Sequence, residues 1–152
     1  APLGPGSLQQ FIEHDPEYHY FNFSPQDQDR LRPAVVFDIL VNNADRKGGH
    51  ILRDEQDHLW LIDHGICLHE EDKLRTVLWD FTGQAIPQPL LEDIERFLDV
   101  LRDEESSMNQ KLRRLLSDRE ISALANRAAH LVKTGVFPEP DKNRRPYPWP
   151  PV

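Results

Sequence analysis

The sequence predicts a single α+β domain that is mainly helical and contains one short β-hairpin. In the second half of the chain, apolar residues recur three and four positions apart, which is typical of helices with one buried face. In the first half, two short apolar stretches flank the polar residues 54–57, which is typical of a hairpin turn. The 152 residues are enough to bury a core of useful size.

The first 25 residues combine turn formers with aromatic residues and predict a linker, in which residues 7–13 form a short strand. A helix is expected over residues 33–43, where Val36, Ile39 and Leu40 recur at helical spacing and Pro33 suits the first turn.

A polar, glycine-bearing loop over residues 45–49 follows this helix. The hairpin comes next, with strands over residues 50–53 and 58–62.

Three helices are expected after the hairpin. The first starts at Pro87 and Pro89, and its apolar stripe consists of Leu90, Ile94, Phe97, Leu98 and Leu101. The second carries Leu112, Leu115 and Leu116.

The third helix starts at Ser117, which forms a capping box with Glu120, and ends at Gly135. Its expected buried face consists of Ile121, Leu124, Ala125, Ala128 and Leu131.

The last 15 residues contain six prolines and predict an extended tail along the surface. A ligand for a proline-reading domain is the alternative role for this tail. The expected organisation is therefore a linker over residues 1–25, the main domain over 26–136 and the tail over 137–152.

The composition excludes several classes of protein. A formal net charge of −8 is unfavourable for a surface that must neutralise nucleic-acid phosphates. No apolar run reaches the roughly 18–20 residues that a transmembrane helix needs. The single cysteine, Cys67, excludes an internal disulfide framework and is typical of a reducing compartment. We therefore expect a cytoplasmic protein with no nucleic-acid partner and no transmembrane segment.

Residues 37–65 carry the chemistry, because a tight hairpin brings its two ends together. Asp45 precedes the first strand, His50 begins it and Asp63 follows the second strand, so all three are expected in one small region. Asp63 emerges at the rim of a buried sheet, and Gly65 lets the chain turn sharply. Two converging carboxylates suit metal-assisted phosphoryl transfer, in which one holds a divalent cation and the other orients or deprotonates a nucleophile.

These residues resemble the loops of a known group of kinases. The sequence NADRKGGH at residues 43–50, followed by IDHG at 62–65, looks like the catalytic and metal-binding loops of phosphatidylinositol 3-/4-kinase-like proteins. The HipA-like toxin kinases share similar loops, and a chiefly actinobacterial phosphatidylinositol kinase-like family resembles the chain most. The resemblance covers roughly residues 7–101. It implies the large, C-terminal lobe of a protein-kinase-like fold, with the hairpin carrying the site.

The resemblance also implies roles for individual residues. Asp45 would accept the proton of the acceptor hydroxyl or orient that group, Arg46 would steady the loop, and Asp63 would bind the metal. The cofactors would be ATP and Mg²⁺ or Mn²⁺. Adenine would lie against the linker strand at Gln10, Phe11 and Ile12, and residues 73–82 would form the activation or substrate segment.

The sequence departs from the family pattern at two loop positions. His50 stands where the family usually has an asparagine that binds a second metal, and imidazole suits Mn²⁺ or zinc better than magnesium. His50 could instead donate a hydrogen bond to phosphate. Lys47 replaces a histidine and could supply positive charge near a phosphate.

No small lobe precedes Ser7, and the chain begins with Ala1 rather than Met. We therefore expect a fragment of a longer protein, whose N-terminal lobe would be a partner of this chain. The isolated fragment would be inactive or nearly so. The hydroxyl acceptor stays open among a lipid, a protein, a small molecule and the kinase itself.

Three alternative interpretations remain. A pseudokinase or binding module would keep the fold without turnover. A metal-dependent hydrolase would use the histidines and aspartates of this region, namely His50, His58, His64, His69, Asp54, Asp57 and Asp63. Cys67 could act as a nucleophile near His64 and His69, although a cysteine between Ile66 and Leu68 is more typical of a packing residue.

Overall fold

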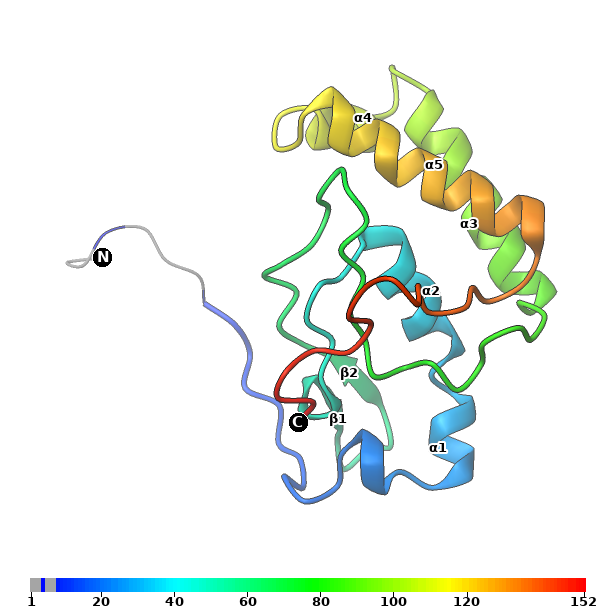
Figure 1. Ribbon diagram of the computed structural model, residues 1–152. Helices are drawn as coiled ribbons and strands as arrows, with labels where there is room; N and C mark the ends of the chain where they lie inside the picture. The colour runs from blue at the N-terminus through cyan, green and yellow to red at the C-terminus, as the bar shows by residue number, and fades with distance from the viewer. Residues whose placement is uncertain (1–3, 5–7) are drawn as a thin grey trace.

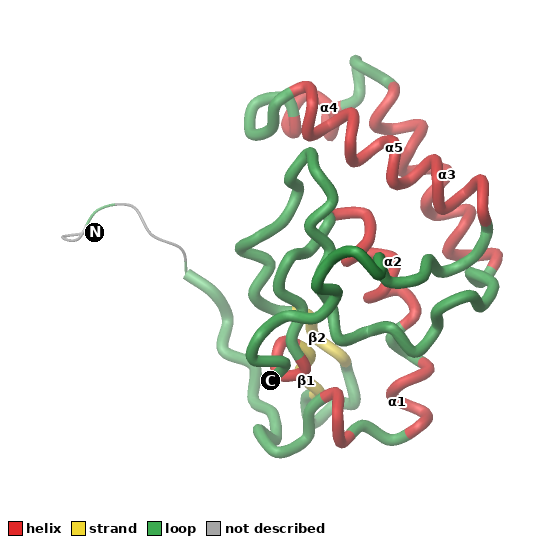
Figure 2. The backbone as a smooth tube through the Cα atoms, in the orientation of Figure 1, coloured by secondary structure: helices red, strands yellow, loops and turns green. Residues whose placement is uncertain are grey.

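A computed structural model describes residue 4 and residues 8–152, and it confirms a mainly helical α+β fold (Figures 1 and 2). Among the described residues, the sheet consists of two antiparallel strands, β1 and β2. In chain order the elements are η1 (Tyr20–Asn22), α1 (Pro25–Asp29), α2 (Arg32–Val41), η2 (Gly48–His50), β1 (Ile51–Arg53), β2 (Leu59–Leu61), α3 (Gln88–Arg102), α4 (Ser107–Leu112) and α5 (Asp118–Thr134).

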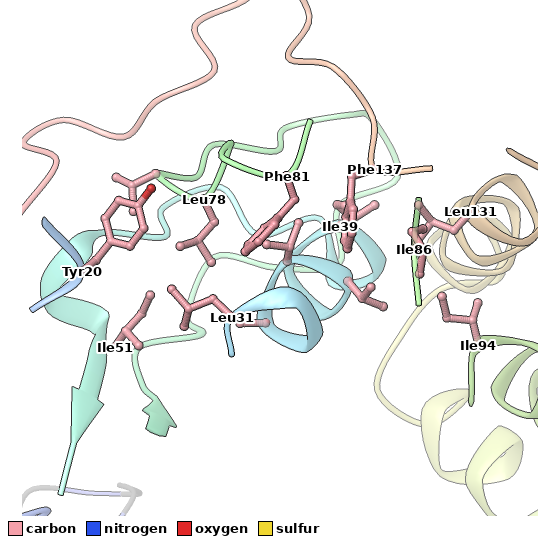
Figure 3. Packing of buried hydrophobic residues seen from close by; sticks show 14 of the residues in the cluster. Tyr20, Leu31, Ile39, Ile51, Leu78, Phe81, Ile86, Ile94, Leu131 and Phe137 are labelled. Atoms are coloured by element: carbon pink, nitrogen blue, oxygen red, sulfur yellow. The ribbon is translucent and has the colours of Figure 1, made fainter. Parts of the chain in front are cut away.

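Helices α3, α4 and α5 form one end of the molecule, and the hairpin and α1 lie at the other (Figure 1). Helix α5 packs along α3 and also contacts α2, which lies between this helical group and the hairpin. Figure 3 shows the core running from Tyr20 and Ile51 beside the hairpin to Ile94 and Leu131 between α3 and α5. Because α2 lies in the middle of this core, it anchors the loop that follows it.

Helix α5 begins and ends where the sequence predicts, whereas α2 ends at Val41, two residues before the expected end. The Ser117 side chain accepts a hydrogen bond from the Glu120 amide, and the Glu120 carboxylate accepts one from the Ser117 amide, so α5 has a complete capping box. Gly135 ends the helix in the left-handed conformation. Helix α4 is shorter than expected because it ends at Leu112, and Leu115 is exposed beyond it.

The strand expected over residues 7–13 is a wrong prediction for the described residues 8–13, which form no strand. Ser7 lies outside the described residues. Leu8 is fully exposed and Phe11 is 75% exposed. Within the part of the chain that the structure describes, no backbone segment pairs with residues 8–13, and an extended segment without a hydrogen-bonded partner is not a strand.

The C-terminal tail returns across the molecule. It starts at Phe137, which is buried in the core against Phe81. The chain then crosses the segment that precedes α3 and ends beside the hairpin (Figure 1). The tail therefore lies against the same end of the molecule as the loops described next.

Candidate active site

The hairpin brings together the loop before β1 and the residues after β2. Ile51 pairs with Leu61, and the Ile62 amide donates a hydrogen bond to the His50 carbonyl over 3.0 Å. This register places His50 directly beside the chain leading to Asp63. The confirmed hairpin thus creates the proximity that the sequence predicts for His50 and Asp63.

Asp63 and His50 face each other across this junction. The Asp63 Oδ2 atom lies 3.4 Å from the His50 Nε2 atom. The Asp63 side chain is 62% exposed, whereas that of His50 is only 14% exposed. The backbone of Asp63 has a φ of 56°, in the left-handed region, so the sharp turn expected at Gly65 falls on Asp63 instead. Aspartate tolerates this conformation better than most residues, and such backbone is typical of functional sites.

The pKa of His50 depends on its burial and on the charges of the neighbouring loop residues. Burial lowers its pKa below the ordinary value, and the charges of Arg46 and Lys47 lower it further, while Asp63 and Asp45 oppose the shift. The Lys47 amide lies within hydrogen-bond distance of the His50 Nδ1 atom. A neutral imidazole that accepts at Nδ1 carries its proton on Nε2, which is the atom facing Asp63.

Asp45 and Lys47 lie on the open side of the same loop. The Lys47 Nζ atom lies 3.5 Å from the Asp45 Oδ2 atom, and both side chains are partly exposed. The Asp45 amide donates to the Asn43 side chain over 3.0 Å, which fixes the start of the loop. The carboxylate and the ammonium group are therefore paired and open to solvent.

Arg46 lies under the loop and connects its parts. Its guanidinium forms a buried ion pair with Asp38 of α2, with 2.9 Å between Nε and Oδ2. Its Nη1 atom also donates to the carbonyls of His50 and Ile62, over 3.1 and 3.0 Å. One side chain thus joins α2, the end of the loop and the residue before Asp63.

Sequence reasoning missed the polar residues of α2 and its C-terminus. Asn43 donates to Asp38 over 3.0 Å, and Asn42 ends α2 in the left-handed conformation with a φ of 55°. The Asn42 side chain donates to the carbonyls of His69 and Glu71 and accepts from the Lys73 amide. The sequence contains a signal for these contacts, because Asp38 interrupts an otherwise apolar stretch that ends in Asn42 and Asn43.

The residues proposed for adenine lie at the opposite end of the hairpin. Gln10, Phe11 and Ile12 line a cavity of about 290 Å³ together with the hairpin turn and Trp60. The turn follows Arg53, whereas His50 and Asp63 lie beyond the other end of the strands. The structure therefore pairs His50 with Asp63 and Asp45 with Lys47, and Arg46 joins the two parts of the loop. It separates these residues from residues 10–12.

The donors at this junction fit one hard cation better than a metal cluster. The exposed Asp63 carboxylate offers oxygen, which suits Mg²⁺. The His50 imidazole would offer nitrogen, which suits Mn²⁺, only in the other tautomer, with the proton on Nδ1. Over residue 4 and residues 8–152, no group of three or more His, Cys, Asp or Glu side chains is arranged to hold a metal. His58 stacks edge-on against Trp60 at the far end of the hairpin, which gives the hydrolase interpretation no support.

Cys67 is half-buried, and burial raises the pKa of its thiol. A protonated thiol is a weak nucleophile, so this environment favours the packing role.

The fold and the two loops define a kinase-like protein, in which an aspartate loop and a second aspartate meet at a hairpin. The sequence profile of the family described as phosphatidylinositol 3- and 4-kinase matches residues 1–128. The chain therefore belongs to the phosphatidylinositol 3- and 4-kinase family.

Relatives occur in bacteria and plants. Protein Rv2133c of Mycobacterium tuberculosis is 44% identical over 124 residues, covering 82% of this chain and 43% of that protein. Phosphatidylinositol 4-kinase gamma 4 of Arabidopsis thaliana is 36% identical over 104 residues, covering 66% of this chain and 18% of the kinase. Phosphatidylinositol 4-kinase gamma 2 of the same plant is 28% identical over 146 residues, covering 93% and 26%.

The chain thus spans less than half the length of each of these relatives. No solved structure matches the chain. Within the described residues, none of the helices has the length and apolar character that crossing a bilayer requires.

Proposed function

We propose that the chain belongs to an ATP-dependent phosphotransferase, which transfers the γ-phosphoryl group of ATP to a hydroxyl group with the help of a divalent metal. The observation that carries this proposal is the position of Arg46, which binds Asp38, the His50 carbonyl and the Ile62 carbonyl at once. This arrangement holds the loop of Asp45 and the turn of Asp63 as one unit. Phosphoryl transfer depends mainly on such positioning and on charge neutralisation.

In this proposal Asp45 and Lys47 act on the reacting groups. The Asp45 carboxylate orients the acceptor hydroxyl and takes its proton as the oxygen attacks the γ-phosphorus, while the bond from the γ-phosphorus to the bridging oxygen breaks and ADP leaves. Lys47 lies 3.5 Å from Asp45 and supplies positive charge close to the transferred phosphoryl group. Arg46 holds the loop from below, because its guanidinium is fully buried.

Asp63 is the residue proposed to hold the metal, since its carboxylate is exposed at the junction. A bound divalent cation neutralises phosphate charge in reactions of this class. His50 has two proposed roles, as a nitrogen ligand or as a hydrogen-bond donor to phosphate. The donor role has more support, because the contact between the Lys47 amide and Nδ1 leaves the proton on Nε2.

The nucleotide base is proposed to lie near Gln10, Phe11 and Ile12, at the turn end of the hairpin. The three-residue strands span about 10 Å at roughly 3.3 Å per residue, so a nucleotide would extend along the hairpin towards Asp63. A preceding N-terminal lobe, which the longer relatives have room for, would complete this site. A cytoplasmic location, where ATP is available, belongs to the same proposal.

Phosphatidylinositol is the first acceptor to test, because two of the relatives are phosphatidylinositol 4-kinases. Other lipids, proteins and small molecules carry the same hydroxyl chemistry, and fold alone does not select among them.

The experiment measures transfer of label from γ-labelled ATP by the intact protein, with phosphatidylinositol vesicles present or absent. Asp45→Asn and Asp63→Asn should each lower the rate, by roughly 10²–10⁴-fold for the proposed base Asp45. Asp57→Asn is the matched control, because Asp57 has a φ of 67° and a similarly exposed side chain at the far end of the hairpin. Parental rates in both site variants would refute the assignment.

Nucleotide binding without turnover is the second candidate, and His50 favours it. An imidazole in place of the family's asparagine offers no oxygen to a second magnesium ion. The same assay separates the two functions, since a binding module would retain ATP and transfer none of its label.

A further inference from the structure

The proline-rich tail contacts the loops of the candidate site directly. The Thr76 amide and the Trp79 indole Nε1 atom both donate to the Pro146 carbonyl, over 3.0 and 3.2 Å. Further along, the Gly48 amide donates to the Pro151 carbonyl over 2.8 Å. Gly48 directly follows Lys47, so the end of the tail is bonded to the loop that carries Asp45 and Lys47.

These contacts form a short ladder of three chain segments. The Arg46 amide donates to the Arg75 carbonyl over 3.0 Å, and the Val77 amide donates to the Arg46 carbonyl over 3.1 Å. Thr76, between these two residues, pairs with the tail through its amide. Residues 75–77 are therefore held between the loop of Asp45 on one side and the tail on the other.

The side chains support the same arrangement. Pro148 is buried, although Tyr147 and Trp149 on either side of it are exposed. The Arg145 guanidinium lies 5.6 Å from the centre of the Trp149 ring. A Cβ atom added to Gly48 would lie 3.6 Å from the Pro151 carbonyl oxygen of the tail and 2.8 Å from the Phe21 ring, so the loop lies in contact with both. The tail and loop are packed together as well as hydrogen-bonded.

We propose that residues 146–152 are a strap that positions the Asp45 loop against the segment at residues 75–77. The tail lies outside residues 1–128, which the family profile matches. The strap touches neither proposed metal ligand, so it is a positioning element. It rests on the proposed function, because it holds the acceptor side of that same site. Loss of the strap should leave the hairpin and helices intact and loosen only the loop and the segment.

The test compares the whole chain with a chain that ends at Arg145, using amide hydrogen exchange. Removing the strap should raise the exchange rates of the Gly48 and Thr76 amides at least tenfold. The Ile62 amide in the hairpin and the Ala128 amide in α5 are internal controls and should keep their rates. Unchanged exchange at Gly48 and Thr76 would overturn the proposal, and equal acceleration at Ala128 would show a general structural role instead.

A peptide of residues 145–152 added in trans to the shortened chain should restore the slow exchange at Gly48, whereas a scrambled peptide should not. If the shortened chain fails to fold, Trp79→Phe keeps the test open, because it removes one donor to Pro146 and retains an aromatic ring. Thr76 exchange should then rise several-fold, and an unchanged rate would count against the strap.

A readout on the reaction separates this proposal from the proposed function. In the intact protein, loss of the strap should raise the KM for the acceptor several-fold and leave ATP affinity unchanged. If the proposed function is wrong, the whole chain and the shortened chain will both fail to transfer phosphate, while the exchange result still decides the strap.

Discussion

Asp38 and Arg46 form an ion pair whose side chains are 1% and 0% exposed, and this pair joins helix α2 to the loop of Asp45. Arg46 donates from Nε and Nη2 to the carboxylate, while its Nη1 atom reaches the two carbonyls at the hairpin end. The guanidinium therefore connects helix α2 on one side with the loop and the hairpin end of the candidate site on the other. The stability of the core and the geometry of the site thus depend on the same side chain.

Removing either partner of this pair should destabilise the fold strongly, because the other charge would remain buried and uncompensated. We expect Asp38→Leu and Arg46→Met each to lower the free energy of unfolding by about 3–5 kcal/mol. The double variant should lose less than the sum of the two, since no buried charge remains. Urea unfolding of the four proteins measures this, and single-variant losses below about 1 kcal/mol would contradict it.

Asn42 should contribute to the free energy of unfolding in two separate ways, through its side-chain hydrogen bonds and through its left-handed backbone. Asn42→Gly keeps the left-handed conformation but removes the hydrogen bonds to His69, Glu71 and Lys73, so a loss of about 1–3 kcal/mol is expected. Asn42→Ala should lose about 1 kcal/mol more, because alanine is strained at a φ of 55°. Chemical unfolding measures both losses, and equal values would rule out the backbone contribution.

Patterns that are local in sequence were predictable here. Helix α5 follows from the Ser117 cap, its apolar spacing and Gly135, and the hairpin follows from its two short apolar stretches around a polar turn. His50 and Asp63 could be placed together because a hairpin joins its own ends. The strand at residues 7–13 failed for the opposite reason, since strand formation needs a partner elsewhere in the chain.

The interior polar contacts could not be predicted in the same way. Asp38 lies on a helix among apolar residues, and only the fold reveals that Arg46 reaches it from the next loop. The bonds from Gly48 and Thr76 to the tail link residues about 70 to 100 positions apart in the sequence, and no short-range pattern encodes them. The positive φ at Asp63 rather than at Gly65 is likewise set by the hairpin junction.

Asp63→Asn should separate ligand binding from stability. Asparagine adopts the left-handed conformation as readily as aspartate, so the melting temperature without ligand should stay close to that of the parent. Stabilisation by ATP with Mg²⁺ or Mn²⁺, measured by thermal shift, should be lost.

Asp57→Asn serves as the control for this experiment. It weakens the contacts of Asp57 with Arg30 and Arg53 and should lower the melting temperature, while the ligand-dependent shift remains. A ligand-dependent shift that survives in Asp63→Asn would contradict the proposed metal site.

The identity of residue 50 should decide which metal supports the nucleotide. His50→Asn replaces a neutral imidazole with an amide oxygen, which is a harder ligand. The ATP-dependent thermal shift should therefore strengthen with Mg²⁺ relative to Mn²⁺ in this variant. If the ratio of the thermal shift with Mg²⁺ to that with Mn²⁺ is the same in His50→Asn as in the parent, His50 does not coordinate the metal.

Cys67 should react slowly with alkylating reagents, because burial raises the pKa of its thiol and the thiolate is the reacting form. At pH 8, Cys67 should be alkylated more slowly in the folded chain than in the chain in urea. The alkylation rate of the folded chain should rise at a higher pH than that of a free thiol. The raised pKa also gives this thiol a pH-dependent contribution to the free energy of unfolding. The thiol's contribution is complete below the pKa of the unfolded chain and is lost as the pH rises through the pKa of the folded chain. Mass spectrometry of iodoacetamide-treated protein gives the rates, with Cys67→Ser as the blank. If Cys67 is alkylated as fast in the folded chain as in the unfolded chain, its thiol is accessible and has no raised pKa. That result would contradict the packing role.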